Sequence, residues 1–247
     1  MSKSIYIYGF HSIESLLETN PESILNVIIQ TKRKDKRVND LIKALTSQKI
    51  AFSNTGKNDL DRMAKGENHQ GVISEVILPP LLNEESLYKA ISNNSKTLIL
   101  ILDSIQDPRN LGACLRCANA AGANYVVVNK DGSAPINALV HKASAGAISS
   151  LKIFHVTNLA RTIQEMQKRG IWVIGLDSNS QSTIYDVSLT DATAVVMGSE
   201  GKGIRRLIKE RCDQIVTIPM SGNIESLNVS VAAGITLFEI KRQRESS

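Results

Sequence analysis

Aromatic residues are scarce in this chain of 247 residues, which has four Phe, one Trp and five Tyr. Proteins that hold single-stranded nucleic acid usually stack successive bases on aromatic side chains, so a broad platform of that kind is not expected here. Long apolar runs are also missing, and none reaches the roughly 18 residues that a membrane span requires. The N-terminal segment has no apolar signal core, and we therefore expect a cytoplasmic protein with no membrane partner.

Cysteine is equally scarce, and its odd number is not the framework of a disulfide-stabilised secreted protein. The three residues are Cys114, Cys117 and Cys212. Cys114 and Cys117 have C-x-x-C spacing, but they lie inside an Ala-rich helical run rather than at a helix start after a strand. No second ligand pair completes a zinc site, so we expect no metal. We interpret both as small apolar residues of a buried helix.

A strong excess of one charge is absent too. The net charge is +5, from 29 basic and 24 acidic residues. Residues 1–76 carry 11 basic and 9 acidic side chains, and residues 97–247 carry 16 and 13. The excess of basic residues is small and is spread evenly over both halves of the chain. It permits a polyanionic partner, but any nucleic-acid site must be a local patch. The densest basic stretch, at residues 32–37, is either such a patch or a solvated turn.

The pattern of apolar residues predicts two α/β regions. In residues 1–78, short strands at 5–8, 26–30, 50–53 and 71–78 alternate with helices at 11–17, 38–48 and 59–64, as in a small α/β domain. Pro79 and Pro80 stop the last strand, because proline lacks the hydrogen-bond donor. Residues 79–96 are predicted to be an interdomain linker with a helical piece at 86–91.

Residues 97–247 have a longer and more regular strand–helix alternation, which predicts a mostly parallel sheet covered on both faces. The predicted strands are 97–102, 125–128, 153–156, 171–176, 194–197 and 214–219. The predicted helices are 110–121, 136–150, 159–169, 204–211 and 227–242. Ligands of such sheets bind beyond the carboxyl ends of the strands, so the loops there are the candidate site.

The first candidate loop, DSIQDPRNLG at 103–112, leads into a helix N-terminus, whose free N–H groups favour anions. Asn110 can cap this helix or contact a ligand. Arg116 follows among Ala, Cys and Leu residues, where an unpaired guanidinium is costly. Arg116 forms either a structural salt bridge or a contact with the phosphate or ribose of a ligand.

The second loop, MGSEGKG at 197–203, is neither a Walker loop nor a dinucleotide fingerprint. Its glycines allow close approach of backbone to a ligand, and Glu200 can accept hydrogen bonds, although a plain turn is the alternative. The third loop, IPMSGNIE at 218–225, leads into SLNVS at 226–230. Ser226, Asn228 and Ser230 are more polar residues than a helix cap requires, which indicates a polar wall facing a pocket.

Together these loops resemble the motifs of the SpoU family of RNA ribose 2′-O-methyltransferases, within the α/β-knot superfamily. DPRNLG at 107–112 with Arg116 resembles the first motif, MGSEG at 197–201 the second and SLNVS at 226–230 the third, all in order. The first half, through YGFHSI at 8–13 and HQG at 69–71, resembles the family's substrate-binding domain, of the ribosomal-protein L30e-like type. For His11 and His69, turn residues bonded to backbone are the plain alternative.

The resemblance implies a small L30e-like α/β domain followed by a trefoil-knotted α/β domain that binds S-adenosylmethionine. It also implies a homodimer with its active site at the interface, and the face of the last helix formed by Val231, Ile235 and Phe238 serves either that interface or the core. In domain pattern the chain is most similar to members that methylate a guanosine ribose in 23S rRNA. The expected macromolecular partner is therefore 23S rRNA. The products would be the methylated RNA and S-adenosylhomocysteine.

Site residues carried over from the family fall into three groups. The catalytic group is Arg116, Asn110, Glu200, Ser226 and Asn228. The cofactor-binding group is Met197, Gly198, Glu200, Gly201, Ile218, Met220, Ser226, Leu227 and Asn228. RNA contacts are expected from Lys32, Arg33, Lys34, Arg37, His11 and Arg109. Arg116 is the family's proposed base or activator, but an arginine stays protonated, so it could instead hold the target's phosphate.

Two other functions stay open at this point. One is the same chemistry on tRNA or another rRNA site, although the minimal tRNA enzymes lack the N-terminal domain. The other is a non-catalytic RNA-binding or ribosome-assembly factor that keeps the fold.

Overall fold

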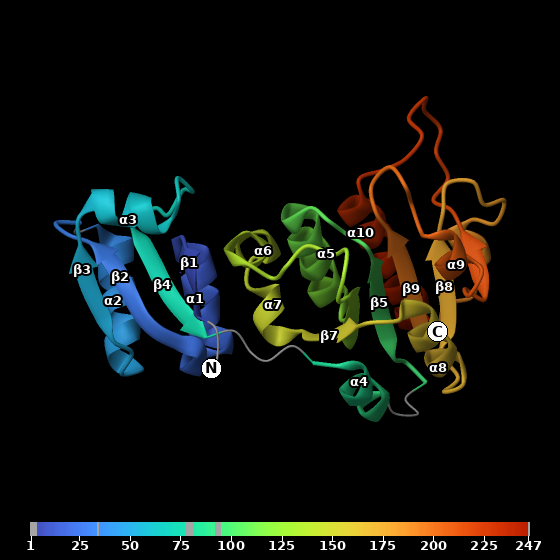
Figure 1. Cartoon of the computed structure of the whole chain (residues 1–247), viewed down its shortest axis with the longest axis horizontal. Coiled ribbons are helices and arrows are strands. Elements are labelled where there is room, and N and C mark those ends of the chain that lie inside the picture. The colour runs from blue at the N-terminus through green and yellow to red at the C-terminus, as the bar shows by residue number, and fades with distance from the viewer. Residues whose placement is uncertain (1–3, 34, 78–81, 92–94, 247) are drawn as a thin grey trace. The chain divides into compact units, whose positions relative to one another are not determined.

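The computed structural model describes residues 4–33, 35–77, 82–91 and 95–246 (Figure 1). Contacts divide the chain into two compact units, of which one comprises Met1–Pro80 with Ile136–Ser150 and the other Leu81–Pro135 with Leu151–Ser247. Among the described residues no helix is long and apolar enough to cross a membrane.

The first unit is built on a four-stranded sheet with the order β1-β4-β2-β3. Strand β4 is antiparallel to β1 and β2, and β3 is parallel to β2. The strands are β1 (Ser4–Tyr8), β2 (Ile24–Gln30), β3 (Phe52–Thr55) and β4 (Val72–Ile77). Helices α1 (Phe10–Thr19) and α2 (Lys36–Ser47) form one apolar cluster with the sheet, and α3 (Lys57–Met63) forms another around Leu60. The strand–helix alternation read from the sequence is therefore present.

The predicted single helix at 136–150 is wrong, because the chain forms two short helices, α6 (Ala138–Ser144) and α7 (Ala147–Ser150). Ala145 and Gly146 between them have positive φ values of 47° and 88°. A right-handed helix cannot continue through that conformation. Ala145 gives no sequence signal for it, since alanine favours helix.

The second unit contains a six-stranded, fully parallel sheet with the order β10-β8-β9-β5-β6-β7. The strands are β5 (Leu98–Asp103), β6 (Tyr125–Asn129), β7 (Lys152–Val156), β8 (Trp172–Leu176), β9 (Thr193–Gly198) and β10 (Gln214–Val216). Every residue of β5 is buried, as expected for a central strand whose two faces are covered. The predicted mostly parallel sheet is confirmed.

Helices cover this sheet in two groups. On one face α4 (Glu84–Ala90), α8 (Leu159–Gln167) and α9 (Arg206–Lys209) share an apolar cluster with the strands. Elsewhere on the unit, α5 (Pro108–Ala121) packs against α10 (Val229–Glu245), which also contacts β9 (Figure 1). After edge strand β10 the chain therefore returns toward the middle of the sheet.

Several predicted boundaries in the second unit differ from the structure, and among them α5 begins at Pro108, with Asp107 rather than Asn110 as its N-cap. The helix expected at 204–211 is limited to Arg206–Lys209, and the strand expected at 214–219 ends at Val216. The last helix begins at Val229 rather than 227, because the side chain of Asn228 caps it by accepting from the Ser230 N–H. The short 3-10 helices Pro21–Ser23 and Ile184–Asp186 had no counterpart in the sequence pattern.

The described part of the predicted linker packs against the second unit. Leu87 of α4 is fully buried, and the Tyr125 hydroxyl donates to the Ala90 carbonyl at 2.7 Å. The Glu84 carboxylate accepts from the backbone N–H groups of Thr157 and Asn158, at the start of α8, where negative charge is favoured. The helical piece expected at 86–91 is α4 itself.

Candidate active site

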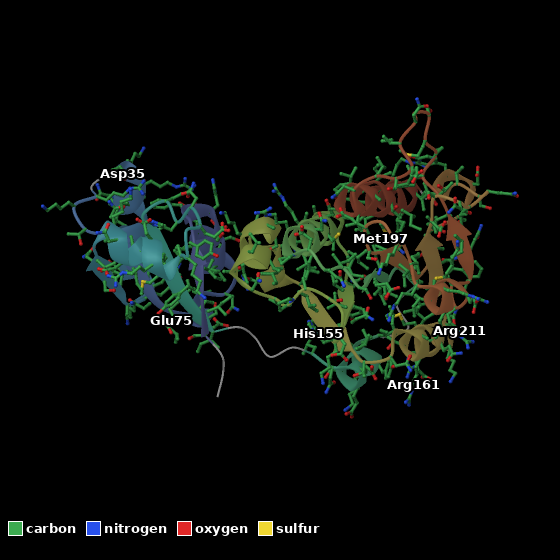
Figure 2. All side chains as sticks on the ribbon, turned by 45° about the horizontal axis from the view of Figure 1, so that its top comes forward. Asp35, Glu75, His155, Arg161, Met197 and Arg211 are labelled. Carbon is green, nitrogen blue, oxygen red and sulfur yellow. The ribbon has the colours of Figure 1, made fainter. Side chains whose placement is uncertain are left out.

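A cavity of about 830 Å³ opens beyond the carboxyl ends of β8, β9 and β10. Its volume is within the range of about 300–1,000 Å³ that is usual for cofactor sites. All nine residues predicted to bind the cofactor lie on its wall. They are Met197, Gly198, Glu200, Gly201, Ile218, Met220, Ser226, Leu227 and Asn228. Figure 2 labels Met197 near the end of β9.

The loop after β9 folds tightly over one side of this cavity. Ser199 and Gly203 exchange two backbone hydrogen bonds of 3.1 and 2.8 Å, and Gly201 between them has φ of 79°. A Cβ atom at Gly198 would collide with the backbone of Gly203 and Ile204. Glycine at 198 is therefore required for this closed loop, which carries Glu200 at its tip.

Asn228 connects the three predicted motifs. Its Nδ2 donates to Asn110 Oδ1 at 3.0 Å and to Glu200 Oε1 at 2.6 Å. Its Oδ1 accepts from the Ser230 N–H and hydroxyl at 2.9 and 2.6 Å. One side chain thus caps α10 and holds a carboxylate and a second amide at the edge of the cavity. Ser226, also predicted as catalytic, lies on the cavity wall and is exposed.

Arg116 lies on α5, six residues beyond Asn110, with an exposed side chain. Within the described ranges it forms no ion pair, so the structural salt bridge considered for it is not observed. Its guanidinium stays available to a ligand. Arg109, predicted to contact RNA, is exposed at the first turn of the same helix.

The thiols of the C-x-x-C pair lie on the buried side of α5. Burial raises the pKa of Cys114 to about 12, and proximity to Cys117 and Glu200 adds to this. Burial also raises the pKa of Cys117, although Arg116 opposes it. The Cys117 Sγ lies 3.5 Å from the Ser230 carbonyl oxygen, so this thiol fills space between α5 and α10. No group of three or more His, Cys, Asp or Glu that could hold a metal occurs among the described residues.

The predicted RNA-binding arginines of the first unit already have partners. Arg37 donates to both carboxylate oxygens of Glu14, at 3.0 and 2.8 Å. Arg33 pairs with Asp35 and donates to the Gln70 carbonyl. Both guanidinium groups lie over the ring of Phe10, at 5.0 and 4.7 Å from its centroid.

The remaining predicted contacts of the first unit differ in exposure. Lys32 is exposed, whereas Lys34 lies outside the described residues. The side chain of His11 is 82% exposed and its Nδ1 is 3.3 Å from Arg37 Nη2. His69 is buried, and its Nδ1 accepts from the Gly71 N–H at 2.9 Å, as a turn residue bonded to backbone would. Its Nε2 lies 2.9 Å from Asp61 Oδ1.

Sequence reasoning missed part of the cavity wall. Asp177, Ser178 and Asn179, which follow β8, lie on it, and so do Lys202 and Thr217. The position of 177–179 after a predicted strand was the available signal, since carboxyl ends of parallel strands meet at one edge. Asp177 bonds to Lys209 at 2.8 Å, and this pairing helps to lower the pKa of its carboxyl against the effect of burial.

Two family models match the chain. The SpoU rRNA Methylase family matches residues 97–238, which is more than half of the sequence. The chain belongs to this family. A second model, RNA 2'-O ribose methyltransferase substrate binding, matches residues 6–80. The family named from the three loops is thereby confirmed.

Individual SpoU relatives extend the likeness over nearly the whole chain. The 23S rRNA (guanosine-2'-O-)-methyltransferase RlmB of Haemophilus ducreyi is 46% identical over 241 residues, covering 97% of this chain and 98% of the relative. The SpoU methyltransferase AviRb of Streptomyces viridochromogenes, solved with AdoMet, superimposes with a TM-score of 0.80 at 22% identity, covering 99% and 92%. This likeness confirms the predicted fold class, including the α/β-knot domain.

A TrmH/SpoU tRNA modifying enzyme of A. aeolicus is also similar, at 31% identity and a TM-score of 0.57. The match covers 83% of that enzyme but only 66% of this chain. The tRNA enzyme therefore aligns with only about two thirds of the present sequence, whereas the rRNA relative aligns with almost all of it.

Proposed function

We propose that this protein transfers a methyl group from S-adenosylmethionine to the ribose 2′-hydroxyl of a guanosine in 23S rRNA. The observation that carries the proposal is the meeting of Asn110, Glu200 and Asn228 at the edge of a cofactor-sized cavity. These residues come from the three separate motifs of the family. The choice of substrate rests on the full-length likeness to RlmB.

The cavity fits S-adenosylmethionine in size and chemistry. Apolar side chains of Met197, Ile218 and Leu227 suit an adenine ring, while backbone N–H and C=O groups of these loops can satisfy its polar edge. When bound, the group supplies a methyl already activated by a sulfonium. The protein then has to place the acceptor in line and handle one proton.

The side chains beside the cavity have separate tasks in this proposal. Asn228 holds Glu200 by a 2.6 Å hydrogen bond and so fixes the direction of its carboxylate. That carboxylate, with Asn110 and Ser226, surrounds the position of the target hydroxyl. Arg116, which has no ion pair within the described ranges, holds the adjacent phosphate by bidentate contact and favours loss of the hydroxyl proton.

The two parts of the chain would share one structured RNA. We assign residues 1–78 to an RNA substrate-binding domain, 79–96 to a linker and 97–247 to the methyltransferase domain. The few aromatic residues suit recognition of ribose, backbone and folded shape better than stacking on a single strand. Because Arg33 and Arg37 are engaged with Asp35 and Glu14, RNA phosphates would have to compete with these carboxylates for the guanidinium groups.

The assembly we propose is a homodimer in the cytoplasm, where ribosome biogenesis supplies the RNA. Val231 and Phe238 are 49% and 46% exposed on one face of α10. Apolar side chains so exposed on one helix face are suited to a second copy of the chain. Sedimentation of Phe238→Glu would give a monomer if this face forms the dimer, and an unchanged mass would reject it.

A methyl-transfer assay compares the substrate classes directly. The protein is incubated with labelled S-adenosylmethionine and either 23S rRNA or tRNA that lacks the modification, with Asn228→Asp as the control for site-dependent transfer. Label in 23S rRNA alone supports the proposal. Label in tRNA alone identifies a tRNA enzyme, and no label in either RNA identifies a binding or assembly factor.

A further inference from the structure

Asp103, the last residue of β5, is fully buried. Its carboxylate accepts from the backbone N–H of Arg205 at 2.9 Å and from the Arg205 guanidinium at 2.7 Å. The amide of Asn129, at the end of neighbouring β6, can be oriented to accept from the same guanidinium and to donate to the Leu102 carbonyl at 3.2 Å. A buried carboxylate is stable only when it is fully paired, and these contacts provide that pairing.

The position of Asp103 relates this pair to the cavity. In the β5–β9 register Asp103 lies opposite Gly198, where the loop carrying Glu200 begins. Arg205 follows Gly203 and Ile204, just beyond the end of the same loop. One carboxylate therefore lies beside the start of the loop and binds the residue after its end.

A second ion pair lies on the opposite side of the loop. Lys209, four residues beyond Arg205, donates to Asp177 at 2.8 Å, directly after β8. Strands β8 and β5 are the two neighbours of β9 in the sheet. The segment after the loop is thus fixed to both strands that flank it. Both carboxylates are more buried than their cations, with exposed fractions of 0% and 15% against 52% and 37%.

We propose that Asp103 and Arg205 are positioning residues that hold the loop 198–203, and with it Glu200, in the geometry needed for cofactor binding and methyl transfer. The inference rests on the proposed function, since Glu200 matters only if this cavity binds S-adenosylmethionine. Neither residue touches the 2′-hydroxyl in the proposal, and both act through the loop. The Asp177–Lys209 pair supports the same loop from the side of β8.

The chain offers a matched control in the adjacent residue. Arg206 also forms an ion pair, with Glu210 at 2.8 Å, but its side chain is 93% exposed and it contacts neither strand end. Arg205→Gln and Arg206→Gln each remove one guanidinium and so break one ion pair with a carboxylate. Only the first of these changes weakens the attachment of the loop to β5, where the backbone N–H of residue 205 is then the remaining donor to Asp103.

Isothermal titration with S-adenosylhomocysteine tests the proposal. Because a misplaced site loses affinity steeply, Arg205→Gln is expected to weaken binding at least about tenfold. Arg206→Gln is expected to change it less than about twofold, as for exposed pairs. Arg205→Lys retains the charge but not the planar guanidinium with its several fixed donors, so its affinity is expected to fall between those of wild type and Arg205→Gln.

Methyl-transfer kinetics separate positioning from a merely structural role. If Arg205 acts through Glu200, Arg205→Gln alone lowers kcat. The double variant Arg205→Gln with Glu200→Gln then has nearly the same kcat as Glu200→Gln alone. Equal affinity of wild type and Arg205→Gln, or additive losses in kcat, would overturn the inference while leaving the proposed function intact. Wild-type protein that binds no S-adenosylhomocysteine would instead overturn both.

Discussion

A single amide, that of Asn228, combines a structural and a chemical task in four hydrogen bonds. Its oxygen caps α10, and its nitrogen joins Glu200 to Asn110. The two tasks use different atoms, so a substitution can separate them. Asp has a capping oxygen but no N–H donor, whereas Ala has neither.

Asn228→Asp is therefore expected to keep the fold and lose activity. The new carboxylate still caps α10 but faces Glu200 without a donor, so the direction of Glu200 is no longer fixed. We expect methyl transfer to fall at least about tenfold. In urea denaturation the free energy of unfolding should change by less than about 1 kcal/mol, because the pair is exposed. Wild-type activity in this variant would contradict the role given to the amide.

Gly198 is expected to tolerate no side chain. In Gly198→Ala the added Cβ meets the backbone of Gly203 and Ile204, so the loop must open. Affinity for S-adenosylhomocysteine, measured by calorimetry, should fall at least about tenfold. Gly222→Ala is the matched control, because a Cβ at Gly222 has no atom within 4 Å. Similar affinities of the two variants would show that the closed loop is not needed.

The cysteines are expected to be inert in the native protein. Burial raises the pKa values of Cys114 and Cys212 to about 12, so almost none of either thiol is the reactive thiolate at pH 8. Mass spectrometry after iodoacetamide treatment should show both unmodified in native protein and both labelled in urea. A disulfide between Cys114 and Cys117 in the native protein would contradict this expectation.

Helix α10 is fixed at its C-terminal end by Arg244. This guanidinium donates to the carbonyl oxygens of Lys96, Thr97, Leu189 and Asp191, at 2.7, 3.3, 3.2 and 2.5 Å. These carbonyls lie in the segments that precede β5 and β9. One side chain thus ties the last helix to the amino ends of the two central strands.

Arg244→Ala should destabilise the second unit by about 2 kcal/mol, because four carbonyls lose a charged donor. Lys241→Ala, on the same helix with a weak 3.8 Å pair to Glu245, should cost less than about 0.5 kcal/mol. The only tryptophan, Trp172, lies in β8, so its fluorescence reports unfolding of this unit. Equal midpoints for the two variants would show that Arg244 does not anchor α10.

Elements with a strong periodic pattern were predictable, and those set by local backbone conformation were not. Buried β5 reads as a continuous apolar run, and α5 ends at Ala121, as predicted, because Gly122 has a φ of 80°. The break at Ala145 and Gly146 was not predicted, because alanine favours helix and a single glycine is tolerated inside a helical pattern. Helix α9 is shorter than its pattern because Arg205 takes an extended conformation and turns its side chain to Asp103.

At the site, the residues that could be predicted are those that belong to the three motifs. Residues of the second and third motifs were placed on one cavity because carboxyl ends of parallel strands converge. The Asp103–Arg205 contact joins positions 102 residues apart and belongs to no motif, so only the fold shows it. The same is true of Asp177 with Lys209.

The chain as a whole combines a methyltransferase region, matched at residues 97–238, with an N-terminal region, matched at residues 6–80 by an RNA substrate-binding model. That combination, matched over 97% of the chain by an rRNA enzyme, is the reason for favouring rRNA over tRNA. The tRNA enzyme of A. aeolicus corresponds to only 66% of the chain.

Removing residues 1–78 should therefore reduce transfer to 23S rRNA while the remaining chain still binds S-adenosylhomocysteine.

Identification of the methylated atom distinguishes ribose methylation of 23S rRNA from every other outcome. Unmodified 23S rRNA is incubated with the protein and labelled S-adenosylmethionine, and the product is then digested to nucleosides or hydrolysed in alkali. We expect 2′-O-methylguanosine at one nucleotide, with the neighbouring phosphodiester resistant to alkali because its 2′-oxygen is blocked. Label on a base, label in tRNA alone, or no transfer at all would contradict it.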